Sequence, residues 1–104
     1  MLIGKLFVAA LLPLLATANT HSECWCKTSS ESVCQKSACI IYGERRAYFD
    51  LPAGVHPSQL STQWIGQSCI VRGNNVLLDG IKAIGGKEYA QACKDACNAE
   101  SRCN

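Results

Sequence analysis

Apolar residues form one long run at the start of the chain and short patterned groups after it. The run from Leu6 to Leu15 follows Lys5 and precedes Ala16-Thr17-Ala18, whose small side chains suit signal-peptidase cleavage. A helix that crosses a membrane needs ~20 consecutive apolar residues, so this run is too short. We therefore expect residues 1–18 to be a signal peptide and residues 19–104 to be one secreted domain.

Helical periodicity occurs in two segments. An apolar stripe at helical spacing predicts a helix over 87–97, and it consists of Tyr89, Ala92, Cys93, Ala96 and Cys97. The capping box Thr28-x-x-Glu31 predicts a second helix from Ser29 to about Ile40, with a polar loop as the alternative.

Extended segments surround these helices. Strands are predicted around Cys24–Cys26, over Arg45–Leu51, over Gln63–Arg72 and over Ser101–Asn104. Gly73-Asn74-Asn75 is a turn signal, and the prolines after Leu51 mark a loop. The order strand, helix, strand, strand, helix, strand predicts an α+β fold, a small disulfide-rich two-layer sandwich.

All cysteines of the chain follow the predicted signal peptide. Their even number in a short exported domain predicts a disulfide framework with no obligatory free thiol. Zinc sites usually pair ligands two to four residues apart, whereas this chain begins with Cys-x-Cys, so we expect no metal and no other cofactor. The eight disulfide cysteines are Cys24, Cys26, Cys34, Cys39, Cys69, Cys93, Cys97 and Cys103.

Spacing leaves two clamping arrangements open. Cys24 and Cys26 share one face of a strand, about 6.6 Å apart. Cys93 and Cys97 stack one helical turn apart, about 6 Å along the axis. Either this strand pair bonds to that helix pair, or Cys24 and Cys26 bond to different helices.

The charge pattern argues against two function classes. The chain has 10 Lys and Arg against 8 Asp and Glu, and the two signs alternate along it. Nucleic-acid grooves and lytic peptides need a basic face, so we expect neither nucleic-acid binding nor stable membrane insertion.

Three groups of residues are candidates for function. Pro52, Val55, His56, Pro57 and Trp64 form a candidate binding loop with an aromatic anchor. Arg45-Arg46 is a candidate dibasic processing site, with a charged strand end as the simpler interpretation. His56 with Glu44 or Asp50 is the only acid–base pair we consider, and a solvated loop histidine is the better interpretation, so we expect no catalytic residue and no enzyme.

These features together resemble a known family. Glu23-Cys24-Trp25-Cys26, the cysteines of the first helix, Cys69, and Cys93 followed by Cys103 are similar to the small killer toxin of corn-smut viruses and to related secreted fungal effectors. The later spacings depart from that toxin. The resemblance implies a ferredoxin-like βαββαβ sandwich and an extracellular fungal effector without an enzymatic site. Its partner would be a host or competitor protein. The alternative functions are an antimicrobial toxin against competing cells and an inhibitor of an extracellular hydrolase.

Overall fold

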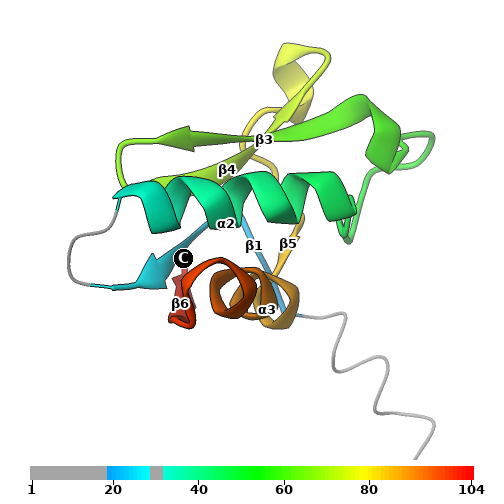
Figure 1. The fold of residues 1–104 in the computed structure, drawn as a ribbon. Helices are drawn as coiled ribbons and strands as arrows, with labels where there is room; N and C mark the ends of the chain where they lie inside the picture. Colours follow the sequence, from blue (N-terminus) through cyan, green and yellow to red (C-terminus); the bar gives the residue numbers. More distant parts are fainter. Residues whose placement is uncertain (1–18, 29–31) are drawn as a thin grey trace, which may run out of the picture.

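The computed structural model describes residues 19–28 and 32–104, arranged as two helices and two antiparallel sheets (Figure 1). The expected signal peptide lies outside these residues, and so does Glu31 of the expected capping box. The elements in chain order are β1 Thr20–His21, β2 Glu23–Lys27, α2 Ser32–Arg45, the 3-10 turn η1 Pro57–Gln59, β3 Leu60–Ile65, β4 Ser68–Gly73, the 3-10 turn η2 Val76–Leu78, β5 Ile84–Gly85, α3 Gly86–Cys97 and β6 Glu100–Cys103.

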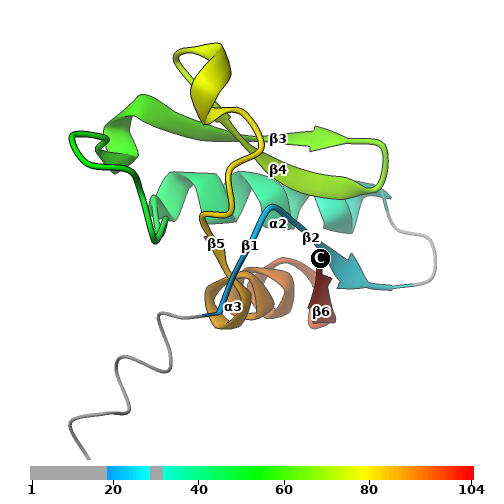
Figure 2. The ribbon, with the colours of Figure 1, turned by 180° about the vertical axis from the view of Figure 1, so that it is seen from behind.

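The larger sheet has the strand order β3-β4-β2-β6, and all neighbouring strands are antiparallel. Helix α2 connects β2 to β3 while β4 lies between them, and α3 connects β4 to β6 while β2 lies between them. Helix α2 lies in front of β3 and β4 in Figure 1 and behind them in Figure 2, so it covers one face of that half of the sheet. The expected α+β class is confirmed, and the ferredoxin-like assignment stays a prediction.

A second, two-stranded sheet was not expected. Strand β1 pairs with β5 through Thr20–Gly85 and His21–Ile84. Both strands contain only two residues, which is too short for an alternating pattern to be visible in the sequence. This small sheet fixes the chain that enters β2 beside the start of α3.

The core consists of bridged cysteines and aromatic side chains. Its largest fully buried side chains include Tyr42 of α2, Tyr89 of α3 and Ile84 of β5. The rings of Tyr42 and Tyr89 lie 5.6 Å apart, and those of Tyr42 and Tyr48 lie 5.7 Å apart. The Tyr42 hydroxyl donates to the Ala47 carbonyl and accepts from the Gly85 amide at 3.0 Å. One tyrosine thus joins the end of α2 to β5.

The strand expected over Arg45–Leu51 is wrong. Helix α2 continues to Arg45, and Tyr48 contributes only an isolated bridge to Ile84. Burial of Cys34, Ala38 and Tyr42 on one face continues the helical spacing past the expected end. The β-branched pair Ile40-Ile41 lowered the apparent helix propensity there, and core packing outweighs it.

The single extended segment expected over Gln63–Arg72 is two strands. Gly66-Gln67 forms a two-residue turn between β3 and β4, and Gly66 has the positive φ of 65° that glycine adopts without strain. The register runs from Ile65 opposite Ser68 to Leu60 opposite Gly73. The expected helix over 87–97 and the expected final strand are confirmed as α3 and β6.

Candidate binding surface

Four disulfide bonds join all eight cysteines. The bridges are Cys24–Cys103, Cys26–Cys93, Cys34–Cys97 and Cys39–Cys69. Cys24 lies opposite Cys69 on β4 and opposite Cys103 on β6, so the three form a row across the sheet. Because Cys69 is bonded to α2, this row lies on the helix-facing side of the sheet.

Neither clamping arrangement is correct as a whole. Cys26 is bonded to α3, as the first arrangement requires, but Cys24 is bonded to β6 across the sheet. Cys97 is bonded to Cys34 of α2 instead of β2. The two pair spacings involve one strand and one helix only. Strand β6 and helix α2 also contact this region, and they supply the partners of Cys24 and Cys97.

Three sulfurs gather where β2, α2 and α3 meet. The Sγ atoms of Cys26, Cys34 and Cys97 lie within 4.8 Å of one another. Each of them belongs to a disulfide bond, so none is a thiolate that binds a metal ion. The cluster is the covalent junction of the two layers.

Every bridge connects the chain before residue 40 to the chain after residue 68. Arg45-Arg46, the candidate processing site, lies between these two groups of cysteines. Cleavage there would produce two chains that stay joined by all four bridges.

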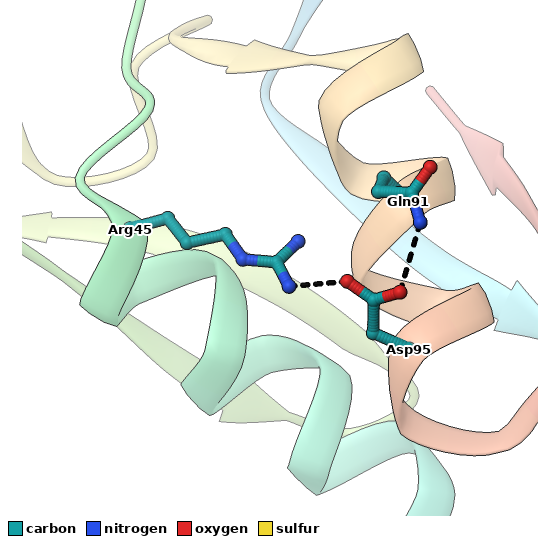
Figure 3. Close-up of polar contacts among 3 residues, drawn as sticks. All are labelled: Arg45, Gln91 and Asp95. Carbon is teal, nitrogen blue, oxygen red and sulfur yellow. Dashed lines mark hydrogen bonds and ion pairs between the residues drawn. The ribbon is translucent and has the colours of Figure 1, made fainter.

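The two arginines have different surroundings. Arg45 ends α2 and forms an ion pair with Asp95 of α3, which also accepts from Gln91 at 2.8 Å (Figure 3). The hydrogen bonds from Arg45 and then from Gln91 hold the pKa of the exposed Asp95 below its usual value. Arg46 has a φ of 50° and donates to the Pro57 carbonyl at 3.3 Å. Arg45 is therefore helical and paired, whereas Arg46 begins the exposed connection.

The candidate loop is a pair of consecutive turns. The Val55 amide donates to the Pro52 carbonyl at 3.1 Å, and Gly54 has the φ of 83° typical of this turn. The His56 amide donates to Gln59 Oε1 at 2.7 Å. His56 is exposed, while Val55 and Pro57 are partly buried.

Trp64 does not join this loop. It lies four residues after Leu60 along β3, directly opposite Cys69, and packs partly buried against the core. The two catalytic alternatives are also separated in their contacts. Asp50 accepts from Thr20 at 2.9 Å, and within residues 19–28 and 32–104 no side-chain hydrogen bond joins His56 to Glu44 or Asp50.

The most exposed large apolar side chains of the described residues were not expected from the sequence. Val76 and Leu77 in η2 are 83% and 87% exposed, whereas Leu78 beside them is 5% exposed. One helical turn of three residues cannot bury three consecutive aliphatic side chains. The sequence Val76-Leu77-Leu78 after an asparagine was therefore the available sign that some of these side chains are exposed. We call Val76 and Leu77 with their supporting turn the apolar turn.

Hydrogen bonds hold the apolar turn in one conformation. Asn75 Oδ1 accepts from the Leu77 amide at 2.9 Å, and Asp79 Oδ1 accepts from the Gly73 amide at 3.1 Å. The Gly80 amide donates to the Val71 carbonyl at 2.7 Å, which closes the base of the turn on β4. A turn that is held by buried Leu78 and by these bonds presents its two aliphatic side chains without further ordering.

No protein-family model, curated protein or solved structure matches this chain. No helix within residues 19–28 and 32–104 has the length and hydropathy needed to cross a membrane. The resemblance to the killer-toxin family therefore stays a prediction.

Proposed function

We propose that this chain is a secreted, killer-toxin-like effector that acts outside the cell by binding another protein. Four bridges in a chain of 104 residues support export to an oxidising compartment, where such bonds form and persist. The role is binding and not catalysis.

One observation carries the proposal, the exposure of Val76 and Leu77 on a turn that is already ordered. Burying a Val or Leu side chain contributes about 1.5–3 kcal/mol, and ordering a flexible loop costs part of that gain. The hydrogen bonds that Asn75 and Asp79 accept from the Leu77 and Gly73 amides lower this cost before binding. The apolar turn thus has the properties of an interface anchor.

Charge next to the apolar turn favours a protein partner over a membrane. Arg72 is paired with Asp79, with its Nε 3.4 Å from the carboxylate, so the charge of this arginine is already balanced and attracts an anionic lipid surface less strongly. The partner that fits is a protein with an apolar pocket and a polar rim.

Photo-crosslinking from the apolar turn tests this function. A photoreactive leucine analogue at position 77 should give a crosslinked product with oxidised protein in host extracellular fluid. The same analogue at Val33, which is 71% exposed on α2, is the matched control. Unlabelled wild-type protein added as a competitor should abolish the product. The unlabelled Val76→Ser, Leu77→Ser double variant should need a concentration at least about tenfold higher to do so, which corresponds to a loss of about 1.4 kcal/mol in binding free energy.

Two other results would replace the proposal. Growth inhibition of fungi or bacteria by the oxidised protein, unchanged in the double variant, would indicate an antimicrobial toxin. Stoichiometric inhibition of an extracellular hydrolase that is lost on changes in residues 52–58 would indicate an inhibitor. Equal crosslinking from positions 77 and 33 would exclude the apolar turn as the anchor.

A further inference from the structure

Within residues 19–28 and 32–104 only β4 pairs with β3, so β3 forms one edge of the four-stranded sheet. Its six residues, Leu60–Ile65, include no charged residue and no proline. Natural proteins usually protect such an edge with lysine, proline or a bulge, because its free backbone groups pair readily with another strand. This edge has none of these features.

The hairpin geometry identifies the backbone groups that point outward. In a two-residue hairpin the flanking residues, here Ile65 and Ser68, form a hydrogen-bonded pair, and the two pair types then alternate along the ladder. The N–H and C=O groups of Thr62 and Trp64 therefore point away from β4. The Leu60 amide already donates to the Pro57 carbonyl, which leaves its carbonyl outward.

A groove of about 250 Å³ runs beside this edge. Its walls are Ile40, Gly43 and Glu44 from α2, and Leu60, Ser61 and Thr62 from β3. Helix α2 can approach β3 closely because Gly43 has no side chain, and a Cβ atom there would collide with Thr62. The Thr62 hydroxyl donates to the Cys39 carbonyl at 2.7 Å. Ile40 is 59% exposed above the groove.

We propose that β3 binds an extended, neutral segment of another protein as an added strand. A strand beside β3 places every second side chain on the helix side of the sheet. The side chain opposite Thr62 then enters the groove against Ile40, so an apolar residue fits there. Main-chain hydrogen bonds to Thr62 and Trp64 supply affinity, and the groove supplies specificity.

Two features favour a peptide segment over the other occupants. Glu44 and Arg46 both line the groove, so their opposite charges favour a neutral ligand. A stable dimer buries about 1,200–2,000 Å² of total surface, whereas a six-residue strand beside a groove of about 250 Å³ suits a peptide. This surface shares no residue with the apolar turn, so either proposal can fail alone.

A displayed library of random linear peptides, selected on the oxidised protein, tests the inference. Enriched peptides should alternate apolar residues, and their addition should shift and protect the Thr62 and Trp64 amides in NMR spectra. The Ile40→Glu variant should weaken binding at least about tenfold, because a carboxylate then faces an apolar side chain. Val33→Glu, on the same helix and outside the groove, should bind normally, as should the Val76→Ser, Leu77→Ser variant.

N-methylation of the peptide gives an independent readout. Methylating alternate amides of an enriched peptide should abolish binding in one register and spare it in the other, because only alternate groups face β3. Absence of enrichment, unchanged binding to Ile40→Glu, or tolerance of methylation in both registers would overturn the proposal. A concentration-dependent dimer with contacts at β3 would assign this edge to a second copy and also overturn it.

Discussion

The loss of stability on removing each disulfide bond should not follow the order of the bonds' sequence separations. Cys24–Cys103 spans 79 residues and Cys39–Cys69 spans 30, so loop length alone makes the first bridge more stabilising. We predict the opposite order for the double variants Cys24→Ala, Cys103→Ala and Cys39→Ala, Cys69→Ala.

The reason is that the bridges are nested. When Cys24–Cys103 is absent, Cys26–Cys93 still closes the chain. The loop that is released is about twelve residues long, because the sequence separation is two from Cys24 to Cys26 and ten from Cys93 to Cys103. The chain-entropy model then gives a loss of about 2.8 kcal/mol.

No other bridge replaces Cys39–Cys69 in this way. The shortest alternative path runs through Cys34–Cys97 and is about as long as the 30-residue loop itself, so the same model gives a loss of about 3.6 kcal/mol. Cys39 and Cys69 are also both fully buried, whereas Cys103 is half-buried, and lost packing therefore acts in the same direction.

Urea unfolding of the oxidised variants without reductant, followed by tryptophan fluorescence, measures the difference. The Cys39–Cys69 variant should unfold about 0.5 M earlier in urea than the Cys24–Cys103 variant, at slopes typical of small proteins. If the Cys24–Cys103 variant is equally or more destabilised, the nesting argument is refuted. Wild-type protein carried through the same oxidation is the control.

Three further predictions concern the core and the connection after α2. Tyr42→Phe should destabilise the protein by about 1–3 kcal/mol in urea unfolding because the buried Gly85 amide loses its acceptor, while Tyr89→Phe should cost almost nothing because no group bonds the Tyr89 hydroxyl within residues 19–28 and 32–104. Burial raises the pKa of Tyr42 and Tyr89, and it raises the pKa of Tyr48 to about 12. These neutral tyrosines add stability below their ordinary pKa of about 10, and that stability is lost as the pH rises further. Ultraviolet titration should therefore show tyrosinate only as the protein unfolds. Gradual ionisation near pH 10 in the folded protein would contradict this. Cleavage after Arg46 by a dibasic-specific protease should leave one species on a non-reducing gel and two on a reducing gel, and separation without reductant would contradict the pairing.

The strongly periodic parts of the fold were predictable. Helix α3 appears in the sequence as an apolar stripe and strand β2 as Cys-x-Cys alternation, and the structure has both within one or two residues of the expected bounds. The expected short final strand, β6, is also within one residue of its expected bounds. The end of α2 was not predictable, because Ile40 and Ile41 favour extended structure locally while burial of Tyr42 continues the helix. Tertiary packing, which the local pattern does not contain, decided that boundary.

The candidate surface was less accessible to sequence reasoning. Pairing of the cysteines depends on which strands are neighbours, and the position of Cys24 between β4 and β6 is set by the sheet order. Trp64 was grouped with the loop because aromatic residues anchor interfaces, yet it packs partly buried against the core. Val76 and Leu77 were not identified from the sequence as a surface, and only the burial of Leu78 beside them shows that the chain turns them outward.

Disulfide mapping of the protein from its natural source tests the central claim, a covalent scaffold built from four disulfide bonds. Digestion without reductant and mass spectrometry should find the linked pairs Cys24–Cys103, Cys26–Cys93, Cys34–Cys97 and Cys39–Cys69, with no free thiol. Free thiols, a bound metal ion, or both Cys24 and Cys26 linked to α3 would contradict it.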